Sequence, residues 1–470
     1  MSFLVPDKVV ALAKTIRDAG GRALLVGGSV RDTLMGLEPK DWDLEAYRID
    51  PVNLRAILDQ FGPVNVVGEA FTVYKLGLAL DVSLPRRERK SGRGHRAFVI
   101  EGDPAMSFED ASRRRDFTIN AILQDPLTSE IIDPFGGQQD IQAKVLKAVS
   151  ADTFSEDSLR VLRAAQLAAR FEFDIAEDTV ALCRGIDLSD LPSERVWGEM
   201  EKLLLLARRP SVGLGWLRQL GVLEQLFPEI ATLIDVPQDR EWHPEGDVFV
   251  HTQLVADRAR ELIDDLPYPR QVTVMLAAVA HDFGKPASTE FIDGRLRSRG
   301  HEEAGVEPTV RFLDRLKIHT LDGFDVRGQV IALVRDHLKP GEFFKKQDQV
   351  GDGAFRRLAR KCELDLLYRV ARADSLGRNA EWVPREQWYG AEAQEWFIQR
   401  ARELAVEKLP PAPILLGRHL LEMGLEPGQR IGEITKAVYE MQLDGRVGSL
   451  ADAKNAAKKI LSADSADYAD

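Results

Sequence analysis

With 470 residues, the chain is too long for one hydrophobic core, and we expect two to four domains. Hydrophobic residues make up 44% and charged residues 29%, as in ordinary globular proteins. No apolar run approaches the roughly 20 residues that span a bilayer, and no signal-peptide pattern is visible, which excludes a membrane protein. The two cysteines, Cys183 and Cys362, cannot form a disulfide framework, and we expect a cytoplasmic location.

The formal net charge of −12 argues against a generally basic surface for nucleic acid. Binding is local, however, and the segment 85–96 carries six Lys or Arg residues and one Glu. Its Gly and Ser residues are typical of a mobile loop. Composition therefore does not exclude RNA as a partner.

Residues 1–150 mix helix and strand signals. Val5–Ala19 has the spacing of an amphipathic helix, which Gly20-Gly21 would end. Alternating or apolar runs predict three strands, at Arg22–Val26, Trp42–Tyr47 and Tyr74–Leu84. The beginning of the chain is therefore expected to form a small mixed sheet with flanking helices.

From Glu156 onward the sequence is typical of helices almost without interruption. Leu159–Phe171 and Val196–Leu206 repeat apolar residues with the helical period. The proline-containing stretch Phe227–Gly246 indicates a domain boundary, and Pro410–Pro413 indicates another. The fold class predicted is α+β, with a mixed-sheet head followed by all-helical domains.

Two glycines join the first strand to the next helix, in Val26-Gly27-Gly28-Ser29. Glycines there let a backbone approach a phosphate, and Arg31 one turn later would meet a triphosphate. Asp41 and Asp43 lie two apart on the next strand, so both carboxylates face one way. Such a pair repels unless a cation lies between, and Mg²⁺ prefers carboxylates and substrate phosphates. Asp81 on a later strand is a candidate third carboxylate.

These motifs resemble the polymerase-β-like nucleotidyltransferases, and more narrowly the class II CCA-adding enzymes and bacterial poly(A) polymerases. The resemblance rests on GGSVRD and DWD, and on Arg113–Ala121, which is similar to the family motif RRDFTxNA. Asp133–Gly137, Glu156–Arg160 (EDxxR) and Ser193–Trp197 resemble further family elements. The resemblance implies that Arg115 and Arg163 contact the nucleotide, and that Asp116 and Asn120 hold the sugar and the geometry of the site.

The EDxxR element has a physical logic of its own. Asp157 and Arg160 are three apart, so a helix would present them on one face. A carboxylate accepts from the amino groups of C or A, and a guanidinium donates to their ring nitrogen or carbonyl. The pair would choose the incoming base without a template; the alternative is a surface ion pair.

Three further segments bear on the resemblance. Gln166 stands where some relatives have a second arginine, and we leave it out of the site. The basic segment resembles the flexible loop of complete CCA- or A-adding enzymes. Leu167–Phe173 is more similar to the tRNA enzymes than to the poly(A) polymerases.

A second constellation begins at His281-Asp282, which follows the apolar helix Val272–Ala280. His251 lies upstream and Asp374 downstream, and imidazole and carboxylate ligands suit a divalent transition metal that activates water. The four residues resemble the H…HD…D set of HD phosphohydrolases. His301 and His337 are accessory candidates. We interpret His243, His319 and His419 as structural or exposed.

The resemblance implies addition of CCA to the tRNA 3′ end from CTP and ATP, with Mg²⁺ in the head. It also implies HD-domain hydrolysis of 2′,3′-cyclic or 2′-phosphate ends, with a divalent transition metal such as Ni²⁺. Two alternatives stay open, an A-adding or poly(A)-adding enzyme and an HD hydrolase with an RNA-binding head. We expect a monomer or homodimer with four parts: head 1–150, neck 151–235, HD domain 240–385 and tail 390–470.

Overall fold

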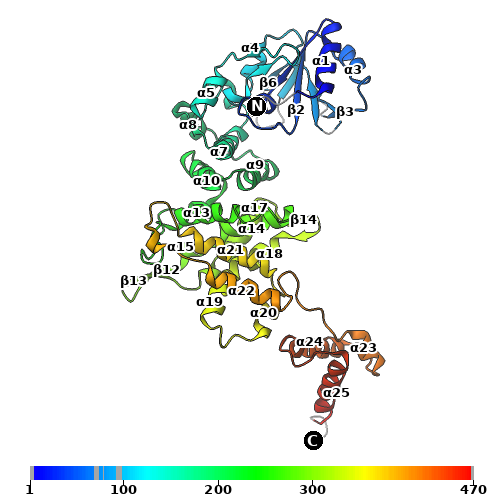
Figure 1. Cartoon of the computed structure of the whole chain (residues 1–470), viewed down its shortest axis with the longest axis vertical. Coiled ribbons are helices and arrows are strands. Elements are labelled where there is room, and N and C mark those ends of the chain that lie inside the picture. Colours follow the sequence, from blue (N-terminus) through cyan, green and yellow to red (C-terminus); the bar gives the residue numbers. More distant parts are fainter. Residues whose placement is uncertain (1–4, 68–72, 78, 91–97, 467–470) are drawn as a thin grey trace. The chain divides into compact units, whose positions relative to one another are not determined.

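The computed structural model describes residues 5–67, 73–77, 79–90 and 98–466 (Figure 1). The chain divides into two compact units, Met1–Pro228 and Glu229–Asp470. The division falls inside Phe227–Gly246, the stretch that its prolines predicted to be a boundary. Each unit is described by itself.

The head is built on a seven-stranded sheet in the order β3-β4-β5-β2-β1-β8-β9. The sheet is mixed, because β2 pairs with β5 in parallel and the other neighbours are antiparallel. Its strands are β1 (Arg22–Val26), β2 (Trp42–Tyr47), β3 (Val64–Val67), β4 (Val73–Leu76), β5 (Leu80–Ser83), β8 (Leu123–Gln124) and β9 (Ile131–Ile132). The predicted mixed-sheet head is confirmed.

Helices α1 (Asp7–Asp18) and α3 (Pro51–Leu58) supply the apolar layer against this sheet. Leu12 and Ile16 of α1 and Leu54 of α3 are fully buried in one core with strand residues such as Leu44. The apolar face of α1, which the helical spacing predicted, thus packs against the apolar face of the strands.

The predicted single strand Tyr74–Leu84 is wrong, because the chain forms two strands there. Gly77, at φ +80°, lies between β4 and β5, a conformation that side chains rarely adopt, and the two strands pair antiparallel. The turn sends β5 back along β2 in parallel register. This geometry brings Asp81 beside Asp43.

The basic segment is only partly a loop. Arg86–Lys90 forms strand β6, which pairs antiparallel with β7 (Phe98–Gly102), so the expectation of a mobile loop fails for these residues. Residues 91–97 lie outside the described part of the chain. Short elements then complete the head: α2 (Gly28–Leu34), α4 (Phe108–Arg113), η1 (Thr118–Asn120), α5 (Gly137–Ala143) and α6 (Ala151–Phe154).

The neck is a helical layer around α7 (Leu159–Phe171), which has the predicted bounds. Gly213 of α10 packs so closely on α9 that a Cβ would lie 2.6 Å from Leu203. The other neck helices are α8 (Glu177–Arg184), α9 (Ser193–Leu206), α10 (Pro210–Gln219) and α11 (Val222–Leu226). Strands β10 (Val145–Leu146) and β11 (Asp174–Ile175) pair in parallel beside α7.

The second unit is centred on α13 (Val248–Arg260), α14 (Tyr268–Ala280), α18 (Val326–Asp336) and α21 (Leu364–Gly377), which pack on one another. Ten of the 13 residues of α14 are buried, so this helix is the core of the unit. Shorter helices surround it: α12 (Pro228–Ala231), α15 (Lys285–Ser288), α16 (His301–Ala304), α17 (Val306–Arg315), α19 (Lys339–Lys345), α20 (Asp352–Leu358) and α22 (Glu392–Glu403).

Two hairpins interrupt the predicted helical region. Strands β12 (Thr289–Ile292) and β13 (Arg295–Ser298) form one, and β14 (Thr320–Leu321) and β15 (Phe324–Asp325) form the other. Each turns through an Asp-Gly pair with positive φ at both residues. This backbone matches the twist of the flanking strands.

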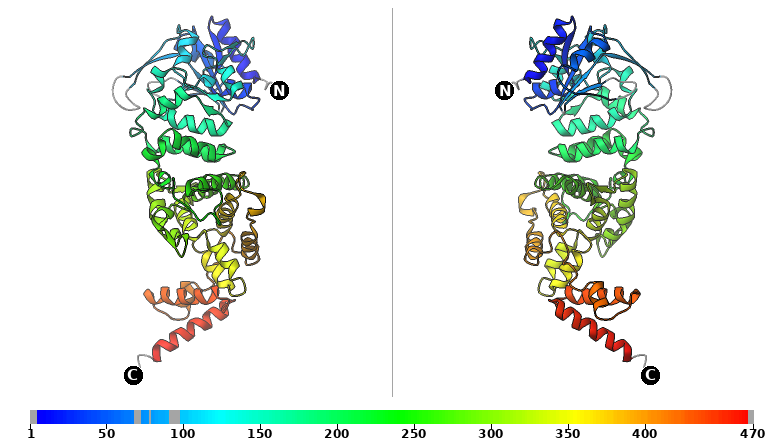
Figure 2. Two further views of the ribbon diagram at one scale, coloured as in Figure 1. Left: turned by 90° about the vertical axis from the view of Figure 1, so that its left-hand side faces the viewer. Right: turned by 90° about the vertical axis from the view of Figure 1, so that its right-hand side faces the viewer.

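The tail has a small core of its own, between α23 (Gly417–Glu422), α24 (Gln429–Leu443) and α25 (Leu450–Ala466) (Figure 2). Glu440 of α24 accepts from Arg357 of α20 at 3.0 Å and from Arg360, just after α20, at 2.6 Å. Within the described ranges, none of the helices has both the length and the hydropathy required to cross a bilayer.

Candidate functional sites

Three carboxylates gather where β2 and β5 begin. Asp43 is the register partner of Asp81, and Asp41 immediately precedes β2. Burial raises the pKa of Asp43; the charge of Arg115 lowers it, and the charges of Asp81 and Asp41 raise it further. Asp43 and Asp81 are thus neighbours on paired strands, and Asp41 is near enough for its charge to act on Asp43.

The carboxylates of Asp41 and Asp43 are open to a cation. Neither makes a hydrogen bond or ion pair with any residue in the described part of the chain. Asp81, in contrast, forms an ion pair with Lys75 at 2.9 Å. Two like charges without a partner repel, and a divalent cation between them removes that cost. The donor set fits Mg²⁺.

Gly27 brings the backbone against this acidic group. Its φ is +71°, and a Cβ there would lie 3.8 Å from the Asp43 carboxylate and 3.2 Å from Nη1 of Arg115. Both the backbone conformation and the space disfavour a side chain. The glycine turn therefore lies at the carboxylates and the arginine, where a triphosphate would meet them.

Sequence reasoning missed Glu45, which is fully buried on β2. It accepts from Arg114 and from the Tyr47 hydroxyl, both at 2.7 Å, and Arg115 lies 3.7 Å away. Burial opposes ionisation, but the charges of Arg115 and Arg114 lower the pKa of Glu45. Glu45 shares the strand face of Asp43, and this twofold spacing was the signal that could have found it.

A buried polar chain connects the head to α7. Asp116 accepts from Arg163 at 2.8 Å and from the Asn120 amide at 2.9 Å. Asn120 in turn accepts from Arg31 at 2.7 Å, and Arg31 pairs with Asp32 at 2.6 Å. Burial opposes ionisation of Asp116, but Arg163 and these hydrogen bonds hold its pKa at about 2.

Arg31 and Arg163 are thus engaged with protein groups. The Arg31 guanidinium is buried and lies 4.6 Å from the centre of the Phe171 ring, at the end of α7. Gly28 lies at the start of α2, where a Cβ would be 3.5 Å from Arg31. Gln166 is buried in α7, and its amide nitrogen has no hydrogen-bond partner among the residues that the structure describes.

Asp157 and Arg160 do not share a helix face as predicted, because α7 begins at Leu159. Asp157 precedes the helix and accepts from the Leu159 N–H at 3.1 Å and from Arg195 at 2.9 Å. Arg160 donates to the carbonyls of Thr153 and Arg114 at 2.7 and 2.5 Å. Both side chains remain partly accessible next to the arginines of the head.

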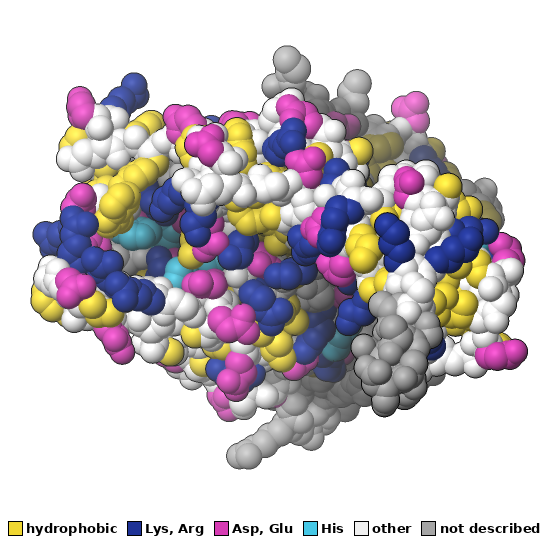
Figure 3. All heavy atoms as spheres, turned by 90° about the horizontal axis from the view of Figure 1, so that it is seen from below, with side chains coloured by type: hydrophobic (Ala, Val, Ile, Leu, Met, Phe, Trp, Pro, Cys, Tyr) yellow, Lys and Arg dark blue, Asp and Glu magenta, His cyan; other side chains and the backbone are white. Residues whose placement is uncertain are grey.

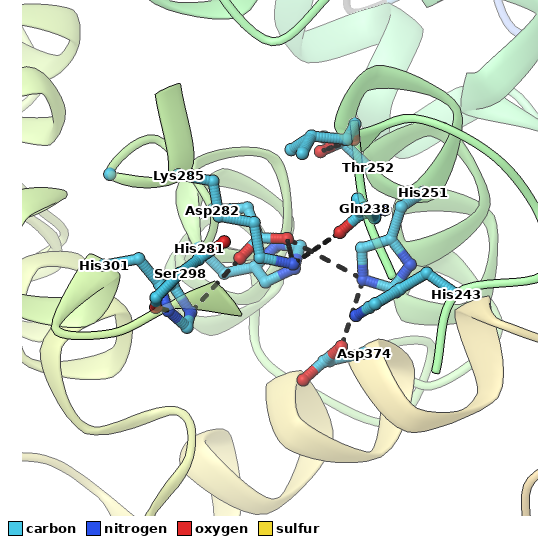
Figure 4. Close-up of polar contacts among 12 residues, drawn as sticks. Gln238, His243, His251, Thr252, His281, Asp282, Lys285, Ser298, His301 and Asp374 are labelled. Atoms are coloured by element: carbon cyan, nitrogen blue, oxygen red, sulfur yellow. Dashed lines mark hydrogen bonds and ion pairs between the residues drawn. The ribbon is translucent and has the colours of Figure 1, made fainter. Parts of the chain in front are cut away.

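In the second unit, three helices bring the four predicted HD residues together (Figure 4). His251 lies on α13, His281 and Asp282 follow α14, and Asp374 lies on α21. His251 Nε2 is 3.1 Å from Asp374, and His281 Nε2 is 3.2 Å from Asp282. Ligand atoms of His251, His281 and Asp374 all lie within 4.8 Å of one another.

The imidazoles are set to offer Nε2 to a metal. His281 Nδ1 lies 2.8 Å from the Ala278 carbonyl, which fixes the proton there and leaves a lone pair on Nε2. That buried Nε2 makes no hydrogen bond to any of the described residues. An unpaired buried acceptor is costly, and a metal ion at this point would satisfy it. The residues therefore fit a transition metal.

His301 and His337 extend the cluster. Each directs Nδ1 to a carbonyl at 2.7 Å, and their Nε2 atoms face each other at 3.2 Å. Asp282 lies 3.4 Å from His301, and these three form a second group of potential ligands. Two facing lone pairs repel unless a proton or a cation lies between them.

Sequence reasoning assigned His243 a structural or exposed role, but it lines the cavity above the cluster. Glu245, also missed, is buried between His243 Nδ1 at 2.9 Å and His251 Nδ1 at 2.7 Å. Burial opposes ionisation of Glu245, but these histidines hold its pKa at about 2. The signal was the segment His243-Pro-Glu245, directly before the helix that carries His251.

Two cations, Lys285 and Arg378, also line this cavity. Lys285 lies 2.7 Å from the Asp282 carboxylate and donates to Gln238 at 2.7 Å. Arg378 lies 3.8 Å from Asp374. In Figure 3 histidine side chains are visible in a hollow whose border carries Lys and Arg and hydrophobic side chains. A metal-ligand set beneath cations suits a phosphate group.

Family models match three stretches of the chain. The poly A polymerase head domain matches residues 23–147, the probable RNA and SrmB-binding site of polymerase A matches 172–234, and the HD domain matches 248–379. The fold and the two sites thus define a nucleotidyltransferase with a poly(A) polymerase-type head and an HD domain.

Similar proteins narrow this class. The multifunctional CCA protein of Xanthomonas campestris pv. campestris (strain B100) is 37% identical over 367 residues, which cover 75% of this chain and 85% of that protein. That of Xanthomonas axonopodis pv. citri (strain 306) is 34% identical over 446 residues, covering 92% and 98%. The chain belongs to the multifunctional CCA protein family.

Solved structures share the fold. The Bacillus stearothermophilus CCA-adding enzyme in complex with CTP has a TM-score of 0.65 at 19% identity, over 97% of this chain and 98% of that chain. The Thermotoga maritima CCA-adding enzyme complexed with tRNA has a TM-score of 0.59 at 18% identity, over 97% and 96%.

Proposed function

We propose that this chain rebuilds the 3′-terminal CCA of tRNA from CTP and ATP and releases pyrophosphate. The observation that carries the proposal is the open pair Asp41 and Asp43 beside the Gly27 turn and Arg115. The multifunctional CCA relatives support it, since they match over most of their length. This support favours complete CCA addition over the A-adding and poly(A)-adding alternatives.

In this proposal Asp41 and Asp43 hold Mg²⁺, with Asp81 beside them. The bound metal would assist deprotonation of the tRNA 3′-hydroxyl and neutralise the departing pyrophosphate. Arg115 and the backbone at Gly28 would contact the triphosphate. Arg31 and Arg163 would reach it only by leaving Asn120 and Asp116, so we assign them chiefly to positioning.

Asp157 and Arg160 would read the incoming base from the neck. Arg160 now donates to backbone carbonyls and Asp157 accepts from Arg195. The Watson–Crick edge of an incoming base would replace these partners of Asp157 and Arg160. Between substrates, the same partners keep both side chains hydrogen-bonded. Asp116 and Asn120 would contact the sugar of the nucleotide and hold the geometry of the site beside α7.

We further propose that the HD cluster hydrolyses 2′,3′-cyclic or 2′-phosphate ends. The observation behind it is the buried His281 Nε2, which has no hydrogen bond within the described part of the chain and lies beside His251, Asp282 and Asp374. Lys285 and Arg378 would hold the phosphate, and the metal would be a transition ion such as Ni²⁺. Of the four proposed parts, the head and neck would carry nucleotide addition and the HD domain would carry hydrolysis.

The test uses full-length protein and tRNA transcripts that lack CCA, CA or only A, each with CTP and ATP separately and together. We expect CC from CTP, and A from ATP only after CC, read at nucleotide resolution. A chain that adds only A, or a long A tail, would contradict the first proposal.

Two matched variants separate the sites. Asp41→Ala should abolish nucleotide addition and leave hydrolysis of 2′,3′-cyclic AMP unchanged, and Asp282→Ala should do the reverse. Loss of both activities in Asp41→Ala, with intact folding by circular dichroism, would overturn the assignment of separate sites.

A further inference from the structure

The cavity of the HD site has an aromatic wall that the metal chemistry does not use. Trp242 lines this cavity and is 49% exposed. Its indole makes no hydrogen bond and no ring contact with residues in the described ranges of the chain. A large apolar side chain left uncovered at the edge of a polar cavity has a face available to a ligand.

The backbone that carries Trp242 is held in place. The Trp242 and His243 N–H groups donate to the Asp239 carbonyl at 3.1 and 2.8 Å. On either side, the Tyr389 hydroxyl donates to the Glu241 carbonyl at 3.0 Å and the Trp382 indole to the Glu245 carbonyl at 3.1 Å. The exposed indole thus stands on a loop fixed before any ligand arrives, which lowers the entropic cost of binding.

The hairpin β12–β13 forms another wall. Leu296 and Ser298 line the cavity, and Phe291 is the register partner of Leu296. Register partners point to the same face, so Phe291, 74% exposed, lies on the cavity-facing side of the hairpin. Arg295 pairs with Glu241 and Asp239, which ties this hairpin to the Trp242 loop.

Chemical character therefore changes across the cavity. At one end it is lined by the histidine cluster with Lys285 and Arg378, which suit a phosphate. At the other end it is lined by the flat indole ring of Trp242. A ligand that is anionic at one end and flat and apolar at the other matches this gradient. A nucleoside phosphate has that shape, and every base offers a π-face to an aromatic side chain.

We propose that Trp242 stacks on the nucleobase of the terminal nucleotide, so that the HD site selects nucleoside phosphates over simple phosphoesters without preference for the base. The proposal rests on the phosphohydrolase function proposed above, and names its substrate class. Trp242 acts here as a specificity-determining residue. Phe291 is placed to add a second apolar contact.

The test compares 2′-AMP with glycerol 2-phosphate, which has a phosphate on a secondary alcohol but no base, using full-length protein with Mn²⁺, Co²⁺ and Ni²⁺ in turn. Trp242→Ala should raise the KM for 2′-AMP at least about fivefold, the lower range for loss of one stacked base, with kcat nearly unchanged. Glycerol 2-phosphate should be hydrolysed as by the wild type. Trp242→Phe should retain most of the preference.

Tyr268→Ala serves as the control, because Tyr268 is 40% exposed in the same unit and does not line the cavity. It should leave both substrates unaffected. The 2′-phosphates of C, G and U should respond to Trp242→Ala as 2′-AMP does. Equal losses for both substrates, or none for either, would overturn the proposal and would leave Trp242 to structure or to a protein partner.

Calorimetric titration with 2′-AMP measures binding without hydrolysis, so it tests stacking by Trp242 separately from the proposed phosphohydrolase function. If the wild type hydrolyses neither substrate, the proposed phosphohydrolase function fails. A binding component that disappears in Trp242→Ala would still support stacking, and no such component in the wild type would refute it.

Discussion

Asp116 is a buried carboxylate with hydrogen-bond partners both on α7 and in its own segment of the head. Arg163 reaches it from α7, and Asn120 and the Phe117 N–H reach it from its own segment. A carboxylate with several donors and a nearby cation stays ionised far below neutral pH. Its charge therefore belongs to the folded state of the head and neck.

Asp116→Asn should destabilise the first unit by about 3 kcal/mol, since it removes the nearest charge partner of the partly buried Arg163 guanidinium and leaves only Glu199, 3.8 Å away. The folded pKa of about 2 lies below the unfolded value of about 3.9, so the charge of Asp116 stabilises fully above pH about 5. This stabilisation is lost as the pH falls through about 4 towards 2. Urea unfolding of wild type and variant from pH 7 to pH 3 checks both points.

The expected result is a difference in unfolding free energy that is constant at neutral pH and shrinks below about pH 4. A difference that does not depend on pH would show that packing, not the charge, is responsible. Asp187→Asn is the control, because Asp187 is exposed and its pKa is lowered only by local bonds to Ser189.

Which residues a sequence reveals depends on how local their partners are. The two-residue spacing of Asp41 and Asp43 indicates their site in the sequence, and the adjacent pair His281-Asp282 indicates the other. Glu45 and Glu245 carry weaker signals. Glu45 shares the strand face of Asp43, but its partner Arg114 is far along the chain. Glu245 lies a few residues before its partner His251, in a segment without a regular pattern. Asp157 was misplaced because the first residue of a helix is set by capping, not by the periodicity that follows.

The turn after His281-Asp282 packs closely on the backbone of α16. A Cβ at Gly284 would lie 1.9 Å from the His301 carbonyl oxygen and 2.6 Å from the Gly305 nitrogen. Both neighbours are backbone at α16, the short helix that places His301. Because Gly284 has an ordinary φ of −85°, only this close approach requires glycine.

Gly284→Ala should therefore displace α16 and destabilise the second unit by about 1–3 kcal/mol, the usual cost of overpacking. Hydrolysis of 2′,3′-cyclic AMP should fall at least about tenfold, which corresponds to about 1.4 kcal/mol, and CCA addition should persist. Activity assays and thermal unfolding check this. Gly341→Ala in α19, where nothing lies within 4 Å, is the control and should be neutral or slightly stabilising.

The hairpins show what element prediction overlooked. Asp293-Gly294 and Asp322-Gly323 are the strongest short hairpin signals, and each was available in the sequence. Their flanking strands are too short to compete with long helical runs around them. Gly77 likewise marked the turn that divides the predicted strand Tyr74–Leu84.

At the scale of the whole molecule, the two proposed metal sites differ in ligand chemistry. The head offers carboxylates, which suit Mg²⁺, and the second unit offers imidazoles with carboxylates, which suit transition metals. The sites lie in different compact units.

Removal of all divalent metal should therefore abolish both activities, and Mg²⁺ alone should restore only nucleotide addition. Hydrolysis of 2′,3′-cyclic AMP should return with Ni²⁺, Co²⁺ or Mn²⁺. Chelator treatment, desalting and stepwise metal addition provide the measurement, with both activities assayed in each sample. Full recovery of hydrolysis with Mg²⁺ would contradict the assignment of a transition metal.

Most of the architecture was accessible from the sequence, because the helices of the neck and of the second unit repeat apolar residues strongly. The boundary in Phe227–Gly246 followed from its prolines. Pairing between distant strands was not accessible, since the order β5-β2-β1 depends on tertiary contacts. The net charge said little about the sites, which depend on a few local side chains.

The parallel pairing of β2 with β5 has a consequence for the newly made chain. Asp43 emerges during synthesis before Asp81, with α3, β3 and β4 between them in the chain, and the two meet only when β5 pairs with β2. Closing such a crossover requires long-range contacts that form slowly. A nascent head in which β5 has not yet paired with β2 therefore lacks the proposed group of Asp41, Asp43 and Asp81, and we expect it to add no nucleotides.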